Sequence, residues 1–260
     1  PVIDACSDIT DWLNGLEADF GSVLLVPHHT SLKDPMPTDF SCWDPEHEVV
    51  VEVHSSWGNS LGGAMSDWEA PTNIVVEAGQ VSNAMDPDGF ALRFGFIGGT
   101  DAHDSLPGDL CVDIPPEHVS TGSLTVVVIP ESEALDRSAL HDAWVDHRTY
   151  STSGPLVPVA IDYYEGDSLL GTLGQDLMLT EGADLKIEMR VPEEWAPYLI
   201  SANIVTPYES HPMHSIADAS WGLTLTSENI PEWVYLAVQL NGSEIYGSDI
   251  CEDGGEDDDE

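Results

Sequence analysis

Two side chains suited to metal binding follow a short apolar stretch near the middle of the chain. Residues 94–98 have the pattern of a buried strand, a Gly-Gly pair ends it, and Asp101 and His103 come directly afterwards. On an extended backbone, residues i and i+2 point to the same face. A carboxylate oxygen and an imidazole nitrogen would therefore project together, as hydrolases present ligands to one metal ion.

Two earlier predicted strands end in the same kinds of side chain. Residues 22–27 end at His28 and His29, and residues 49–54 carry Glu52 and His54. In parallel α/β architecture the carboxyl ends of the strands lie on one face, where sites are built. Residues far apart in the sequence would thus converge, and the predicted metal ligands are His28, Glu52, His54, Asp101 and His103.

The mixture of imidazoles and carboxylates predicts Zn, Mn or Fe, and it is too rich in nitrogen for calcium. His28 and His29 face opposite sides if their strand continues, so His28 is the expected ligand. His29 is then expected to support the site or to contact the substrate. The expected catalytic residues are Glu52, Asp101 and His103, and the expected substrate contacts also include Arg93, Arg148 and Tyr150.

Each pair also has an ordinary structural interpretation. A His-His pair is more often a surface feature than a ligand pair, and Glu52 and His54 could face solvent from an edge strand. The coincidence of three such strand ends favours the metal site. The histidines without a comparable context are predicted to lie at the surface, namely His47, His118, His141, His147, His211 and His214.

Helical and extended patterns alternate through the first part of the chain. The predicted helices are 8–20, 74–85 and 135–148, and the predicted strands are 22–27, 49–54, 94–97 and 124–129. This alternation is typical of an α/β fold.

The pattern changes at about residue 156. Alternating apolar and polar residues predict strands over 157–164, 185–191, 200–205 and 233–240, separated by turn residues. They favour a mostly antiparallel, β-sandwich-like module. We therefore expect an α/β domain over 1–155, a β-rich module over 156–250 and an acidic disordered tail over 251–260.

The charge and the cysteines restrict the partners and the compartment. Six Lys and Arg stand against 48 Asp and Glu, which gives a net charge of −42. Such a surface repels nucleic acid and anionic membranes, and no apolar run is long enough for a membrane span. The acidity suits a solvated surface in a salty or extracellular setting, or diffuse cation binding. Four well-separated cysteines favour two disulfides in an exported protein, extracellular or periplasmic, with four free thiols as the alternative.

Several segments occur in an order that resembles a known family. They are VPHHT (26–30), VEVHSSWGNS (51–60), GFIGGTDAH (95–103), LPG (106–108), RTYSTSGP (148–155) and DSLLG (167–171). Together they resemble the PHP (polymerase and histidinol phosphatase) superfamily, most closely its often exported branch that is catalogued only as a domain of unknown function. The superfamily's opening Asp-x-His-x-His-Thr strand has no counterpart here, so we expect the first barrel strands to be missing from this chain.

The resemblance implies an α/β fold that forms part of a distorted β/α barrel, followed by the β-rich module. It implies hydrolysis of phosphate esters at a centre of two or three metal ions. With the reduced ligand set, one to three ions are expected. By the motif match His28, Asp101 and His103 would be ligands, with Glu52 or His54 between them.

Three functions are consistent with these features. The first is a metal-dependent hydrolase that attacks a small-molecule substrate, possibly a phosphoester, through a metal-activated water. The alternative is a non-catalytic extracellular binding or surface module on a degenerate PHP scaffold. The third is an acidic, cation-buffering extracellular protein.

Overall fold

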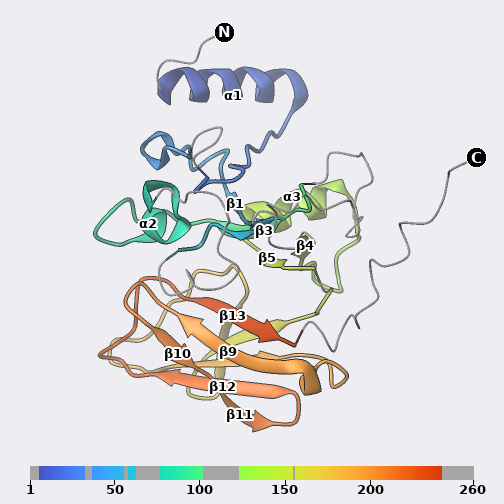
Figure 1. The fold of residues 1–260 in the computed structure, drawn as a ribbon, viewed down its shortest axis with the longest axis vertical. Coiled ribbons are helices and arrows are strands. Elements are labelled where there is room, and N and C mark those ends of the chain that lie inside the picture. Colours follow the sequence, from blue (N-terminus) through green and yellow to red (C-terminus); the bar gives the residue numbers. More distant parts are fainter. Residues whose placement is uncertain are drawn as a thin grey trace, which may run out of the picture.

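The computed structural model describes residues 6–32, 37–55, 58–62, 77–101, 123–154 and 156–241. Figure 1 shows α1 at one end, a layer of short strands in the middle and the later sheets at the other end. The first half contains, in chain order, α1 (Cys6–Phe20), η1 (Phe40–Cys42), β1 (Val50–Ser55), β2 (Gly58–Asn59), η3 (Glu77–Gly79), α2 (Val81–Met85), β3 (Gly95–Gly98), β4 (Leu124–Val127), α3 (Arg137–Val145) and β5 (Thr149–Thr152). The predictions for His103, His118, Cys111, Cys251 and the acidic tail lie outside the described residues.

Strands β1 and β3 form the one parallel pair among the described strands. Glu52 lies opposite Ile97 and His54 opposite Gly98, with a register shift between the two pairs. The valines of β1 are buried on both of its faces, which is the pattern of a strand covered from both sides. The carboxyl ends of β1 and β3 therefore lie side by side, as the sequence predicted for these two strands.

The predicted β/α barrel is wrong. The described sheets are mostly antiparallel, and none of them closes on itself. A barrel needs successive parallel strands, each joined to the next by a crossover connection. Only the step from β1 to β3 has that form in the described part of the chain, because β4 and β5 pair antiparallel although α3 lies between them.

The predicted strand over 22–27 and the predicted helix over 74–85 also differ from the structure. Residues 23–28 belong to no described ladder, although Leu25 N donates to His47 O at 2.9 Å. The described end of the second segment contains only the short η3 and α2. Apolar residues at the expected spacing are thus present, but the chain does not use them for long regular elements.

The second half of the chain forms two antiparallel sheets. One has the order β11-β12-β8-β6-β7 and the other the order β10-β9-β13. The elements are β6 (Ala160–Glu165), β7 (Ser168–Thr172), β8 (Leu185–Arg190), η4 (Ala196–Tyr198), β9 (Leu199–Val205), β10 (Ser210–Pro212), β11 (His214–Ala217), β12 (Ser220–Leu225) and β13 (Tyr235–Leu240). Strands β6, β8, β9 and β13 confirm the four predicted segments.

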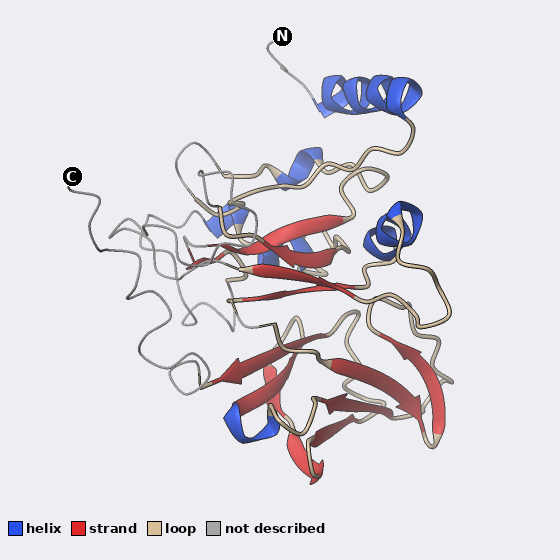
Figure 2. Cartoon of the chain, turned by 90° about the vertical axis from the view of Figure 1, so that its right-hand side faces the viewer, coloured by secondary structure: helices blue, strands red, loops and turns tan. Residues whose placement is uncertain are grey.

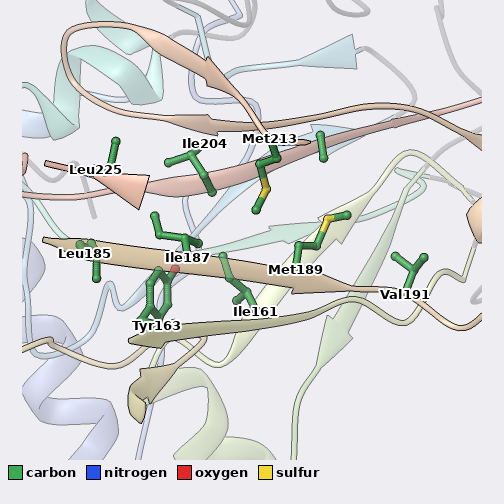
Figure 3. Close-up of a cluster of buried hydrophobic side chains, with 10 residues drawn as sticks. Ile161, Tyr163, Leu185, Ile187, Met189, Val191, Ile204, Met213 and Leu225 are labelled. Atoms are coloured by element: carbon green, nitrogen blue, oxygen red, sulfur yellow. The ribbon is translucent and has the colours of Figure 1, made fainter. Parts of the chain in front are cut away.

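The inward-facing side chains of these strands form the largest core. Figure 3 shows Ile161 and Tyr163 of β6 against Ile187 and Met189 of β8, with Ile204 of β9 above them. Ile187, Met189 and Ile204 have no exposed surface. Full burial of each such side chain contributes about 1.5–3 kcal/mol, so this alternating pattern fixes the register of the module.

Side chains from β13 and the loop before it complete a core in the first half of the chain. Trp233 and Tyr235 pack against the cluster that contains Val53 and Phe94, and the Trp233 indole donates to Met85 O at 2.6 Å. The rings of Phe96 and Tyr235 meet edge to face at 5.2 Å. In Figure 2 the β1–β3 layer accordingly lies directly above the later strands.

Helix α1 confirms the predicted helix over 8–20, but it packs through a narrow face. Leu13 is 1% exposed, whereas Phe20 is 78% exposed. A disulfide between Cys6 and Cys42 joins the start of α1 to η1, so one of the two predicted disulfides is present. None of the helices in the described part of the chain has the length and apolar character that a bilayer crossing needs.

Candidate metal centre

The end of β1, the end of β3 and the extended segment before His28 bring the candidate side chains together. Glu52 N donates to Pro27 O at 3.2 Å, which holds that segment beside β1. Asp101 follows β3 by three residues, and Gly99 N donates to His54 O at 3.1 Å. Three chain segments therefore present their polar ends at one place.

Short distances connect two imidazoles and two carboxylates at this place. The Nδ1 atom of His28 lies 2.9 Å from both carboxylate oxygens of Glu52. The Nε2 atom of His28 lies 3.4 Å from Asp101 Oδ1, and the Nε2 atom of His29 lies 2.9 Å from Asp101 Oδ2. Each imidazole is thus held between a carboxylate of β1 and the carboxylate that follows β3.

Both His29 and Asp101 have a left-handed backbone. Their φ angles are 51° and 55°, in a region that costs an L-residue about 1–2 kcal/mol. Asp and His tolerate it better than most residues. Because His29 is not extended, its ring does not point away from His28, and the two ring centroids are 3.6 Å apart. The backbone cost is offset by a polar contact between the two residues that carry it.

The charges of the cluster favour a cation. The side chains of Glu52 and Asp101 are only 11% and 10% exposed. Hydrogen bonding to Asp101, and then to Glu52, raises the pKa of His28 to about 10. With its protein partners alone, the cluster therefore stabilises a positive charge on His28, and a divalent cation would take the place of that proton.

The donor geometry fits a small divalent ion. One ligand atom from each of His28, His29 and Asp101 lies within 4.8 Å of the other two. Ligands at 2.0–2.1 Å in a tetrahedral site are separated by about 3.3 Å, close to the 2.9 and 3.4 Å found here. The donor set of two imidazoles and a carboxylate is typical of catalytic zinc and of other transition metals.

Glu52 has a different position from the other three residues. Its carboxylate accepts from the Nδ1 atom of His28, which fixes the ring and leaves Nε2 toward Asp101. Metal-binding histidines commonly have such a carboxylate behind them, and it raises the basicity of the ligand nitrogen. The contact that the structure shows for Glu52 is thus with the ring of His28, and its role as a direct ligand stays a prediction.

The structure brings together only part of the predicted set. His28 and Asp101 are in the donor cluster, while His103 lies outside the described residues. His54 forms a hydrogen bond through Nδ1 to Ser123 Oγ, and Ser123 is 1% exposed. His29 enters the cluster as a third donor. The sequence did not predict this, because an extended backbone would have pointed its ring away from His28.

The three predicted substrate contacts have other partners. Arg93 pairs with Asp176 at 2.9 Å on the surface, and Arg148 lies 3.3 Å from Asp146. The hydroxyl of Tyr150 donates to Val157 O at 2.7 Å and accepts from Val159 N. Tyr150 therefore fixes the path of the chain into the β module.

The prediction that His47 lies at the surface is wrong. His47 is 2% exposed, and its Nδ1 atom lies 3.1 Å from Asp44 Oδ2. The sequence signal was the i, i+3 spacing of Asp44 and His47 next to a buried strand. This pair packs under α1, because Glu17 of that helix approaches the other ring nitrogen at 3.9 Å.

Comparisons of the chain with protein-family models, with curated proteins and with solved structures find no match. Function is therefore inferred from the geometry of His28, His29 and Asp101 and from the motifs in the sequence.

Proposed function

We propose that the protein is a metal-dependent hydrolase in which His28, His29 and Asp101 hold a divalent transition metal ion. The observation that carries this proposal is the convergence of three ligand atoms from two distant chain segments within 4.8 Å. Glu52 supports it, because a carboxylate behind a histidine is the usual second half of such a site.

The residues of the chain hold and orient this site. Glu52 fixes the ring of His28, and Ser55 Oγ lies 3.5 Å from the Nδ1 atom of His29. Asp101 supplies negative charge to both rings. A bound divalent ion would polarise a phosphoryl or carbonyl oxygen and lower the pKa of a water molecule.

A small phosphate ester is the proposed substrate. The resemblance of the strand-end motifs to the PHP superfamily supports this class. The net charge of −42 argues against polyanionic substrates, because long-range repulsion would slow their capture. The Cys6–Cys42 disulfide supports an oxidising compartment as the place of action.

Metal binding and hydrolysis are tested separately. The full chain is dialysed against zinc or manganese, its metal content is measured by mass spectrometry, and p-nitrophenyl phosphate hydrolysis is followed. Asp101→Asn and His28→Ala should each lose bound metal and activity. Asp218→Asn and His214→Ala are matched controls, because both residues are exposed in the β11–β12 hairpin.

The outcomes separate the candidate functions. Stoichiometric metal that is lost only in the Asp101 and His28 variants, together with hydrolysis, supports the proposal. Stoichiometric metal without hydrolysis of any phosphoester favours the non-catalytic binding module. Absence of tight metal in the wild-type chain overturns the metal centre itself.

A further inference from the structure

A large cavity lies where the first half of the chain meets the β module. Its volume is about 880 Å³, and its walls include parts of β1, β3, β5 and β13 and the loops over 173–179 and 230–233. His28, His29 and Asp101 are not among the residues that line it. Sites for small molecules are usually concave spaces of about 300–1,000 Å³, so the space has the size of a binding site.

The walls are mainly apolar, and their side chains are incompletely buried. Phe96, Trp233, Leu236 and Val238 line the space, and each of them retains partial exposure although it packs on a core cluster. In a tightly packed interface this apolar surface would be covered, but here it faces a cavity. An apolar ligand would remove that surface from water.

The hydroxyls of strand β5 do not add donors to the same wall. Thr149, Ser151 and Thr152 line the cavity, but their hydroxyl oxygens are buried, with almost no accessible surface. A ligand in the cavity would therefore meet the carbon atoms of these side chains and not their hydroxyl oxygens.

The charged groups at the cavity do not favour a charged ligand. Arg93 and Asp176 neutralise each other at 2.9 Å and are 65% and 85% exposed. Burial lowers the pKa of His147, so its ring is neutral at pH 7. Glu232 is exposed and accepts from Tyr208. A charged ligand would lose its hydration in an apolar space without a buried countercharge.

We propose that this cavity binds an uncharged, mainly apolar molecule. The apolar walls formed by Phe96, Trp233 and Leu236 take the body of the molecule. None of the three proposed metal ligands is part of this binding site.

Two neutral fluorescent naphthalenes test the proposal on the full chain. One is a naphthyl ketone, which carries an acceptor oxygen, and the other is N-phenyl-1-naphthylamine, which carries none. Both should bind saturably at one site, and chelation of metal with EDTA should leave binding unchanged. The anionic probe anilinonaphthalene sulfonate should bind more weakly than either.

Variants locate the site. Leu236→Trp fills the cavity and should abolish binding of both neutral probes, whereas Leu169→Trp, on the exposed outer side of β7, should not. Thr152→Val keeps the side-chain shape and should leave the binding of both neutral probes unchanged, because the Thr152 hydroxyl oxygen is buried out of reach of a ligand.

Equal binding to Leu236→Trp and Leu169→Trp, or no saturable binding to the wild-type chain, overturns the proposal. If Leu236→Trp does not fold by circular dichroism, a benzophenone probe is photo-crosslinked to the wild-type chain and the labelled peptides are mapped. Labels within 149–153 and 230–240 support the cavity. Labels confined to other segments overturn it.

Discussion

Substitution of Gly98 by alanine tests whether close approach of strands at the end of β3 positions the metal centre. A Cβ atom at this position would lie 2.8 Å from Ser123 Cβ and 3.1 Å from His54 O, and still closer to Ser151 Oγ. Real Cβ atoms essentially never come within 3.0 Å of another heavy atom, so β3 must move away from β5. Asp101 is three residues further along the same segment.

The expected loss of stability follows from overpacking. Inserting one methyl group into a closely packed core costs about 1–3 kcal/mol. For a chain of this size each kcal/mol corresponds to about 2–4 °C in Tm, so Gly98→Ala should lower Tm by roughly 2–12 °C. Metal affinity should fall as well, because the displaced strand moves one ligand relative to the other two.

Substitution of Ser151 tests whether its contact with the added Cβ atom at position 98 causes this loss. The hydroxyl of Ser151 is buried and has no partner among the described residues, so Ser151→Ala should be neutral or stabilising by itself. In the Gly98→Ala background it should recover part of the loss, with a coupling energy of about 1 kcal/mol. Thermal and urea unfolding of the four proteins measure this coupling.

The control is Gly15→Ala in α1, where an added Cβ meets no atom within 4 Å. That change should raise helix stability by up to about 1 kcal/mol. The close approach of β3 and β5 at Gly98 is contradicted if Gly98→Ala is as stable as the wild type, or if Ser151→Ala recovers none of the loss.

Three further changes test other parts of the structure. Trp233→Phe removes the indole donor to a backbone carbonyl of α2 and should cost about 1–3 kcal/mol in urea unfolding; a loss below about 0.5 kcal/mol would contradict this. Burial raises the pKa of Glu48, so the charged form of this carboxyl group destabilises the folded state. This destabilisation is absent below the pKa of the unfolded chain and grows as the pH rises above it. Glu48→Gln should therefore raise Tm at pH 7 and not at pH 4, unlike Glu46→Gln at an exposed position; equal gains at both pH values would refute the assignment. Replacement of both Cys6 and Cys42 by serine opens a link across 36 residues and should cost up to about 4 kcal/mol, with hydrogen exchange in α1 rising first; unchanged exchange would show that α1 does not depend on the disulfide.

Local sequence patterns predicted where many of the helices and strands lie, but they predicted poorly whether neighbouring strands run parallel or antiparallel. The Val run of β1 and the apolar stretch of β3 are visible in the sequence, and their parallel pairing was expected. The same kind of pattern surrounds β4, α3 and β5, yet β4 and β5 are antiparallel. An apolar run shows that a strand is buried but not which way its neighbour runs, since pairing depends on contacts between distant segments.

The candidate site was predicted only in part, because its geometry also depends on features that a local pattern does not show. Types and spacing predicted that His28, Glu52 and Asp101 lie together, as they do, but the place of His29 beside them depends on its backbone angles. His29 was assigned to the wrong side because alternation holds only for extended residues, and its φ is 51°. Asp101 is likewise not extended, and its predicted pairing with His103 lies outside the described residues.

The contact between Trp233 and Met85 has a consequence for synthesis of the chain. The two residues are separated by 148 positions, and Trp233 and Tyr235 complete the cluster around Phe94. At about 5–20 residues per second, a ribosome needs roughly 7–30 s to add that length. The aromatic surface around Phe94 therefore stays uncovered in the nascent chain until Trp233 and Tyr235 are made.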